Sequence, residues 1–423
     1  MHLKFFIPIQ MMLRYIINKI TFAKILSFVV FLMAFFCFCN AQNQKIMPPN
    51  DKIYSIDLDK SKEPAFYLST IFDKVKTIIL ETNKNCLIGS VNKLQVFDGR
   101  IYVFDEYIAK SLYVFDEEGR FIRKIGNIGR GPGEYNHIHD FTLDSDHRFI
   151  YLLDDGGRIH QYGFDGDYIR TVRVQIPRAN IRYIHYAKDR IYADVQAWTS
   201  TATDFLLFEI NPADGKILSR SVSVSDNKGW NETYYTGSSF FTPQLNDASK
   251  YAHLFMNYIV SLGDIIHSHV ELKSKNLTTQ KDIANALKAG GMSYEKYAII
   301  ARSSKIRNVH NYVENAHFIF FHYWHTKTTN IVFLDKKTNA VTLANMVNND
   351  LIYKNNEDGV LYPIKFSDAK GMYEIPDDSW LPRFKELAKN GKIVQGLDKM
   401  DQLIKLDEEP NPIIFFYEYK DAE

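Results

Sequence analysis

Short apolar stretches separated by polar turns run through most of the chain, and inside each stretch apolar and polar residues alternate. Residues 101–105 and 149–154 are the clearest examples, and each is followed by a polar turn and two further stretches of the same kind. A period of two residues is typical of strands whose two faces meet different surroundings. It excludes a solenoid of helices and predicts an all-β fold.

The strand-like stretches recur as a unit at intervals of about 50 residues, a spacing typical of propeller blades. Two copies, starting at Asp98 and Asp146, align closely through their turns and third strands. Further copies begin at Arg190, within 251–272, at Ala316 and within 351–374. Six units predict a six-bladed β-propeller over residues 74–423, preceded by a lead-in at 42–73.

The strand-like segments 74–82 and 412–419 have no hairpin partner nearby. Pairing them within one blade closes the ring and covers sheet edges that otherwise promote aggregation. Two helical insertions interrupt the strands, at about 276–300 and 379–391. Thr279 and Asp282 form an approximate capping box for the first, and glycines at 290–291 and 391 end the two helices.

Residues 25–39 form an uninterrupted apolar run after Lys19 and Lys24. The run is short for a membrane-spanning helix and ends in small residues, which is typical of a secretory signal peptide. We therefore expect residues 1–41 to be a signal segment cleaved after Ala41. The protein is then exported, to the periplasm, the cell envelope or the medium.

Two alternatives to cleavage remain open. In the first, the segment stays attached as an N-terminal membrane anchor and is then the chain's contact with the membrane. Lipidation of Cys37 or Cys39 is less favoured, because a bulky phenylalanine precedes each cysteine. Cys86 alone follows the segment, so the mature chain has no pair of cysteines for an internal disulfide.

Composition supports strands and argues against nucleic acid as a partner. Aromatic residues make up 14% of the chain, and 51 basic residues balance 50 acidic ones. Aromatic side chains suit half-buried pleated surfaces. Without a basic stripe, the chain lacks the means to neutralise a phosphate backbone.

Four glycines and a proline lie between residues 126 and 133, in the segment GNIGRGPGEY. A dinucleotide-binding loop needs a helix after the glycines, whereas strand follows here. The segment is therefore interpreted as a tight crossover between blades, where glycine permits positive φ.

Residues 88–135 resemble the first blade of secreted six-bladed β-propeller proteins of anaerobic Gram-negative bacteria, a family related to NHL-repeat propellers. The ending EEPNPIIFFYEYK, at 408–420, is similar to that family's closing strand. The resemblance implies the fold and the exported location. It implies no activity, since fold does not determine function.

In NHL-like propellers, the turns between second and third strands share one face with the crossovers between blades. Flat aromatic and charged side chains on such a face suit a small-molecule, glycan or peptide ligand, or an envelope protein. Glu106 and Asp155 lie in the same turns. The predicted ligand-binding residues are Asp105, Tyr107, Arg130, Glu134, Tyr135, Asp154, Arg158, Trp198, His322, Trp324 and His325.

No catalytic motif supports enzymatic activity, and we expect a binding or interaction module without a cofactor. His317, His322 and His325 lack a carboxylate at ligand spacing, so a metal site is not predicted there. A metal-assisted hydrolase, lactonase or lyase is the alternative, with Ca²⁺ or another divalent ion near Asp105 and Asp154. A scaffolding role, with contacts made by the helical insertions, is a third hypothesis.

Overall fold

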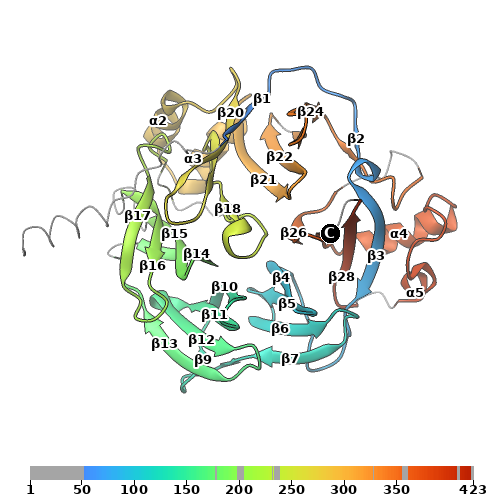
Figure 1. The fold of residues 1–423 in the computed structure, drawn as a ribbon, viewed down its shortest axis with the longest axis horizontal. Helices are drawn as coiled ribbons and strands as arrows, with labels where there is room; N and C mark the ends of the chain where they lie inside the picture. The colour runs from blue at the N-terminus through green and yellow to red at the C-terminus, as the bar shows by residue number, and fades with distance from the viewer. Residues whose placement is uncertain are drawn as a thin grey trace, which may run out of the picture.

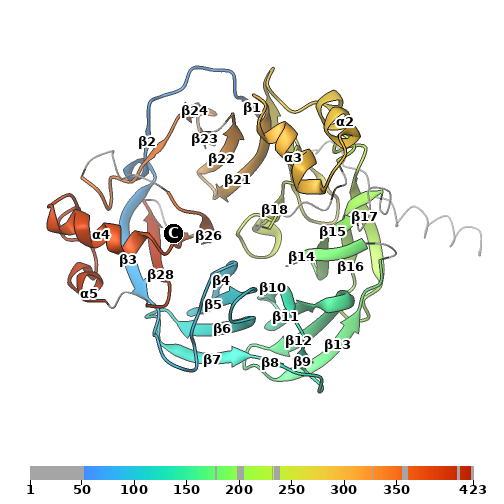
Figure 2. The same cartoon turned by 180° about the vertical axis from the view of Figure 1, so that it is seen from behind.

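Six four-stranded sheets surround a central axis and form the blades of a β-propeller (Figures 1 and 2). The computed structural model describes residues 52–176, 179–197, 204–230, 232, 239–326, 328–354, 361–406 and 410–420. The predicted all-β, six-bladed fold is confirmed. The expected signal segment lies outside the described residues.

Blades one to three follow the predicted order, from an inner strand at the axis to an outer strand at the rim. Hydrophobic residues on both faces of their central strands explain why each sheet is packed between two neighbours. Blade one consists of β4 (Lys93–Phe97), β5 (Arg100–Asp105), β6 (Ser111–Asp116) and β7 (Phe121–Ile125). Blade two consists of β10 (Ile138–Asp144), β11 (Phe149–Asp154), β12 (Arg158–Gly163) and β13 (Tyr168–Arg173). Blade three consists of β14 (Ala179–Ala187), β15 (Arg190–Ala197), β16 (Phe205–Ile210) and β17 (Ile217–Ser223).

Blade five has the same regular order, whereas blades four and six each take one strand from the N-terminal part of the chain. Blade five consists of β21 (Ile306–Glu314), β22 (Phe318–His325), β23 (Thr328–Asp335) and β24 (Val341–Ala344). Blade four consists of β18 (Lys250–Tyr251), β19 (Tyr258–Ser261), β20 (His267–Lys273) and β1 (Tyr54–Asp57). Blade six consists of β26 (Ile364–Ser367), β27 (Gly371–Glu374), β28 (Ile413–Tyr419) and β3 (Phe72–Ile79).

Two strands close the ring. β3 pairs antiparallel with β28, the predicted partnership of the two chain ends. β1 pairs in parallel with β20, placing Ile56 opposite Leu272. Residues 42–73, which the sequence analysis assigned to a lead-in, thus contain the outer strand of blade four. The chain enters the ring at blade four and passes over blade five before it reaches blade six (Figure 1).

Six hydrophobic clusters fill the spaces between adjacent blades in the described part of the chain. The cluster between blades one and two, for example, joins Tyr102 and Phe104 to Phe141 and Ile150. Burial of apolar area at about 25 cal/mol per Å² makes these interfaces the main source of stability.

In the described part of the chain, four α-helices lie on the outside of the ring at opposite edges (Figure 2). α2 (Gln280–Lys288) begins with the predicted capping box of Thr279 and Asp282, and α3 (Ser293–Ala301) follows it. α4 (Trp380–Lys389) buries Trp380 and Phe384 against blade six, and α5 (Met400–Lys405) follows it. Among the described residues, no helix combines the length and apolar character that crossing a membrane requires.

The glycine-rich segment is a crossover between blades one and two. It contains the two-residue strands β8 (Asn127–Ile128) and β9 (Glu134–Tyr135), which pair in parallel. Gly126 has a φ of +64°, and a Cβ there would lie 2.7 Å from the Tyr162 hydroxyl oxygen. That hydroxyl donates to the Gly133 carbonyl at 2.5 Å. Glycine is required because the backbone turns here directly against a buried tyrosine.

Candidate functional site

A cavity of about 570 Å³ lies on the propeller axis. Its walls come from the first residues of the inner strands β4 and β26, from the middle of the inner strand β21, and from β22, which pairs with β21. The volume is within the usual range for sites that enclose a small molecule. The apolar part of the lining includes Phe240, Phe241, Val309, Trp324, Ile331, Met346, Val347, Leu361, Pro363 and Ile364.

The segment that leads into β18, residues 239–249, forms the floor of the cavity, and we call it the axial loop. It curls into the middle of the ring (Figures 1 and 2) and includes the 3-10 turn η3 (Asn246–Ala248). The loop contacts the far ends of inner strands on four blades. Its partners are Ser367, Glu314, His185 and Ser145. Because these ends lie opposite the crossovers between blades, the loop closes that end of the channel.

Irregular pairing in blade five opens the wall of the cavity. The register between β21 and β22 shifts twice, between Ile306 and Val309 and again between His310 and Val313. Such bulges redirect side chains and leave gaps in the ladder. As a result His322 and Trp324, which belong to the second strand of the blade, line the axial cavity together with His310.

The hydrogen bonds around His322 fix its tautomer. The Ile364 backbone N–H donates to Asn311 Oδ1 at 3.1 Å, so the Asn311 amide nitrogen points the other way. That nitrogen donates to His322 Nδ1 at 3.2 Å. The proton of the neutral imidazole is then on Nε2. Nε2 is buried and has no hydrogen-bond partner among the described residues.

His322 is neutral at physiological pH. Burial, reinforced by the neighbouring His310, holds the pKa of His322 well below its usual range. Burial and the charge of Arg307 likewise lower the pKa of His310 to about 4. The cavity therefore offers an uncharged donor at His322 rather than a cation.

Gln244 supplies a complementary acceptor from the floor. Its Nε2 donates to the Glu314 carbonyl oxygen at 2.8 Å, which leaves Oε1 directed elsewhere. Gln244 Oε1 and Asn308 Oδ1 are both buried and unpaired in the described structure. An unsatisfied buried polar atom costs about 1–3 kcal/mol, and such groups call for an explanation. Together with His310 Nδ1 and His322 Nε2, four such atoms belong to residues that line this one cavity, which favours a binding site.

Two lysines line the cavity, and they differ in their partners. Lys93 Nζ lies 3.0 Å from both carboxylate oxygens of Asp140 and 2.6 Å from the Phe141 carbonyl oxygen, so its charge is compensated. Lys365 Nζ donates to the Val91 carbonyl oxygen at 2.7 Å. Burial lowers the pKa of Lys365 to about 8. Among the described residues that line the cavity, none is acidic.

The predicted residues of blade five are divided between the cavity and the rim. His322 and Trp324 line the cavity, while His325, three residues after His322, does not. Trp324 is already in contact with two groups: His310 stacks on it at 5.6 Å, and the Arg307 guanidinium lies 5.3 Å from its ring centre. Trp198 lies outside the described residues.

Asp105 and Asp154 have no free carboxylate oxygens for a ligand. Asp105 accepts from the backbone N–H groups of Gly89, Ser90 and Ile108. Asp154 accepts from Arg158 at 2.6 Å and from His160 at 3.1 Å, in addition to two backbone N–H groups. Their geometry supports a structural role in organising the turns.

The predicted residues around the crossover fall into two groups. Tyr135 is fully buried in the core between blades one and two. Arg130, Glu134 and Arg158 line a second, more open pocket of about 450 Å³ beside the glycine-rich segment. Glu134 Oε2 accepts from the Gly131 backbone N–H at 2.7 Å, so this side chain also supports the loop.

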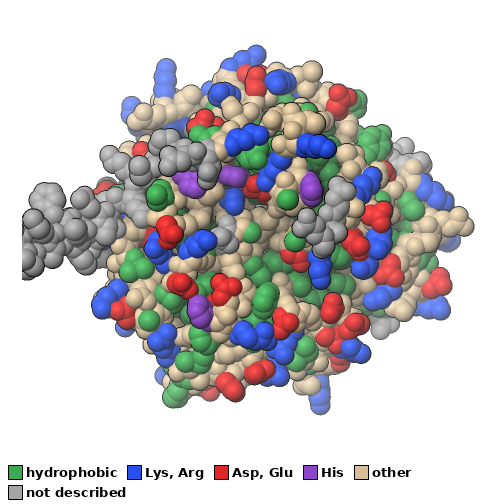
Figure 3. Space-filling model, viewed as in Figure 1, with side chains coloured by type: hydrophobic (Ala, Val, Ile, Leu, Met, Phe, Trp, Pro, Cys, Tyr) green, Lys and Arg blue, Asp and Glu red, His purple; other side chains and the backbone are tan. Residues whose placement is uncertain are grey.

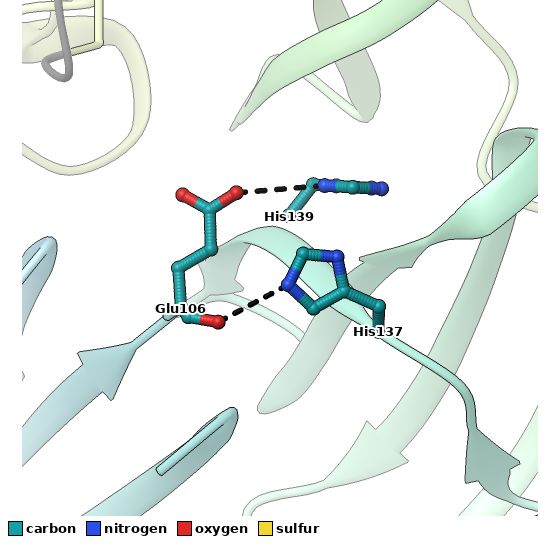
Figure 4. Close-up of side chains that lie close together, drawn as sticks. All are labelled: Glu106, His137 and His139. Atoms are coloured by element: carbon teal, nitrogen blue, oxygen red, sulfur yellow. Dashed lines mark hydrogen bonds and ion pairs between the residues drawn. The ribbon is translucent and has the colours of Figure 1, made fainter. Parts of the chain in front are cut away.

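A polar cluster lies at the turn after β5 and the start of β10, where Glu106, His137 and His139 approach one another (Figure 4). His137 Nε2 donates to the Glu106 carbonyl oxygen at 3.1 Å. His139 lies between the carboxylates of Glu106, at 3.5 Å, and Asp155, at 2.8 Å. The three residues have the donor atoms for a metal ion.

The charges around this cluster do not favour a cation. Arg182 binds both oxygens of the Glu106 carboxylate, at 2.6 and 2.9 Å, and also lies 2.9 Å from the Tyr107 hydroxyl. Burial alone lowers the pKa of His139, but its hydrogen bonds with Glu106 and Asp155 outweigh burial and raise that pKa. The raised pKa of His139 favours its charged form, and with the bidentate Arg182 the cluster resembles an ion-pair network linking blades one, two and three.

The face drawn in Figure 3 does not present a large area of a single charge among the described residues. On the visible part of the face drawn in Figure 3, acidic and basic side chains are interspersed. This agrees with the balanced composition of the chain.

The fold and the axial cavity define a six-bladed β-propeller whose channel is closed at one end. The chain belongs to the family described as "Domain of unknown function (DUF4934)", whose model matches residues 53–418. The search of curated proteins found no match.

Comparison with solved structures gives one match that supports the same fold. A candidate exported protein of Bacteroides fragilis superposes with a TM-score of 0.70 and 19% sequence identity, over 88% of this chain and all of the other. A member of the DUF4221 family from Bacteroides vulgatus has a TM-score of 0.48 and 12% identity, over 82% of this chain and 97% of the other. The predicted resemblance to six-bladed propellers of anaerobic Gram-negative bacteria is confirmed at the level of the fold.

Proposed function

We propose that this protein is an exported or cell-envelope binding module that takes a small molecule into its axial cavity. One observation carries the proposal: a cavity of about 570 Å³, whose far end the axial loop closes, is lined by His322, and the buried Nε2–H of that residue has no partner among the described residues. Donors and acceptors of fixed direction on mostly apolar walls are the usual design of a small-molecule site.

Export is supported by the apolar N-terminal run and by the likeness to the candidate exported protein of Bacteroides fragilis. The run ends in small residues, as signal peptides do. Mass spectrometry of the mature protein tests the cleavage, because peptides from residues 25–39 must then be missing.

Two other roles have less support. A metal-assisted hydrolase, lactonase or lyase requires a divalent ion, and the cluster around Glu106 is already neutralised by Arg182. Scaffolding of an envelope complex would use α2 and α3, where Met292 and Tyr294 are exposed. Deletion of that insertion without loss of co-purifying proteins would count against scaffolding.

A ligand-stabilisation screen tests the binding function. A compound that binds only the folded protein increases its free energy of unfolding, by about 2.7 kcal/mol at a ligand concentration of 100 Kd. The melting temperature rises accordingly. We expect hits from a library of one- and two-ring organic compounds, and their effect should disappear in His322→Ala. The control is His147→Ala, because His147 lies on an exposed turn outside the cavity. Hits that stabilise both variants equally would overturn the assignment of the site.

A further inference from the structure

We propose that the natural ligand is an organic acid, with an oxyanion group bound by Lys365 and an apolar or aromatic body against the blade-five wall. This inference rests on the proposed function and names the chemical class that the axial cavity selects. It combines three features of the lining: an uncompensated lysine, a neutral donor and apolar walls.

Lys365 is the cation that an acid would meet. Its ammonium group has three N–H donors, and the structure gives it the Val91 carbonyl oxygen as a partner. No described residue of the lining is acidic. Burying a charge without an opposite charge is costly, and an oxyanion is the group that compensates it most directly.

Lys365 differs from Lys93 in this respect, although both line the cavity. The carboxylate of Asp140 binds Lys93 at 3.0 Å and fills the role that a ligand would have. One buried lysine of the cavity, Lys93, is thus neutralised by an acidic side chain, whereas Lys365 has no acidic partner among the residues that line the cavity. That contrast points to Lys365 as a binding residue rather than a structural one.

His322 and Gln244 define the rest of the polar recognition. The His322 Nε2–H donor suits a second acceptor oxygen on the ligand, and Gln244 Oε1 suits a hydroxyl or N–H. A neutral imidazole adds direction without adding charge, so the charge selectivity of the site depends on Lys365. An acid and its uncharged analogue should differ mainly in their interaction with this one side chain.

The apolar lining excludes a bare inorganic anion as the best ligand. Phe240, Phe241 and Val309 form one side of the cavity, and Met346 and Leu361 contribute on another. A ligand that fills this volume buries apolar area at about 25 cal/mol per Å². Inorganic phosphate or sulfate offers no such area and should bind weakly.

Binding should depend on pH through Lys365. A bound anion favours the charged lysine, so the complex loses affinity as pH rises above about 8, the pKa of Lys365 in the free protein. The other titratable groups that line the cavity are Lys93, which is paired with Asp140, Tyr312, and the histidines His185, His310 and His322. Burial and the neighbouring Glu314 carboxylate hold the pKa of Tyr312 well above its usual range. The pKa values of His310 and His322 are lowered, so these two side chains are uncharged between pH 6.5 and 9.5.

The test uses matched pairs of one- and two-ring carboxylic acids and their carboxamides, such as indole-3-acetate with indole-3-acetamide and 4-bromophenylacetate with its amide. Affinities are measured by calorimetry or ligand-observed NMR on the full mature protein at pH 7. We expect the acids to bind at least tenfold more tightly than the amides. Lys365→Met should abolish that ratio, and Lys228→Met should leave it unchanged. Lys228 is a suitable control because burial also lowers its pKa to about 8 and it does not line the cavity.

The outcomes separate the two proposals. Amides that bind as tightly as acids, with a dependence on His322, would overturn the inference and leave the binding function intact. Failure of every probe to bind would overturn both. If Lys365→Met does not fold, the wild-type ratio of acid to amide affinity decides: it must fall between pH 7 and pH 9.5, and a constant ratio contradicts the proposal.

Discussion

Ile78 of β3 lies directly opposite Ile414 of β28, so two residues more than 300 positions apart share a sheet. Both belong to the hydrophobic cluster between blades six and one. Ring closure in this protein thus depends on noncovalent pairing between distant segments. The stability of the whole toroid should therefore respond to changes at this strand pair.

Ile414→Ala is expected to lower the free energy of unfolding by about 2–5 kcal/mol, because it removes a fully buried side chain from a packed interface. Chemical denaturation followed by tryptophan fluorescence measures the loss. Ile404→Ala is the control, since Ile404 in α5 is 42% exposed and should lose less than 1 kcal/mol. Equal effects of the two substitutions would contradict the role of the strand pair in closure.

Ring closure could be predicted from the sequence because two apolar strands had no local partner. The second strand that closes the ring, β1, could not be predicted from the sequence. Its four residues, Tyr54–Asp57, pair in parallel with a strand more than 200 positions away, and such a short segment has no distinctive pattern. The place for β1 becomes evident only in the structure, where blade four has three strands from residues 250–273 and β1 supplies the fourth.

Gly126→Ala should destabilise the protein by more than 1 kcal/mol. The residue needs a positive φ, and its Cβ would collide with Tyr162 and Tyr135. Gly163→Ala is a matched control in the same blade interface, because a Cβ at Gly163 meets no atom within 4 Å. Thermal unfolding of the two variants provides the comparison, and a larger loss for Gly163→Ala would contradict the account of the crossover.

Ionisation of Asp154 should make the free energy of unfolding depend on pH in the acidic range. Burial alone raises its pKa, but hydrogen bonds from His160 and from backbone N–H groups, together with the Arg158 charge, outweigh burial and lower the pKa to about 2. A carboxylate with a depressed pKa contributes stability above its unfolded pKa of about 4 and loses it as pH falls toward 2. The contribution is about 2 kcal/mol.

Asp154→Asn should therefore be less stable than the wild type at pH 6, and the difference should shrink as pH falls from 4 to 2. Urea denaturation across this range measures it. Asp165→Asn serves as the control, because the Asp165 side chain is 76% exposed. A difference that stays constant with pH would show that Asp154 acts through packing alone.

Lys365→Met should stabilise the ligand-free protein at pH 7, by up to about 3 kcal/mol. Burial lowers the pKa of Lys365 from 10.5 to about 8, which means that the charged form is disfavoured in the folded state. The buried charge of Lys365 therefore reduces the free energy of unfolding by its full amount below about pH 8, and this reduction disappears as pH rises from about 8 to 10.5. Binding residues commonly reduce stability in this way. Urea unfolding at pH 7 and pH 10 tests the effect, and destabilisation by Lys365→Met at pH 7 would contradict it.

Removal or addition of metal should leave the protein unchanged. Arg182 neutralises the Glu106 carboxylate, so EDTA, Ca²⁺ and Zn²⁺ are expected to cause no shift in melting temperature. Arg182→Met leaves a buried carboxylate without its partner and should cost about 3–5 kcal/mol. A metal-dependent rise in the melting temperature of the wild type would instead favour the enzymatic alternative.

The candidate site was only partly predictable. His322 and Trp324 were selected because they lie in a predicted turn between second and third strands, on the face shared with the crossovers between blades. Lys365, Gln244 and His310 were not selected, since each belongs to a segment without a motif. His310 lies between the register shifts of β21, Gln244 lies on the axial loop, and Lys365 lies at a register shift of β26, and all three arrangements depend on tertiary contacts. His137, His139 and Arg182 were missed because three different blades bring them and their partners together.

The most direct test of the central claim is a crystal structure of the protein with 4-bromophenylacetate, or with the tightest-binding brominated acid of the screen. The anomalous signal of bromine locates the probe without ambiguity. The account predicts one dominant peak inside the axial cavity, above Gln244 and between the walls that carry His322 and Lys365. Bromine peaks confined to the outer surface or to the pocket beside the glycine-rich segment would contradict it.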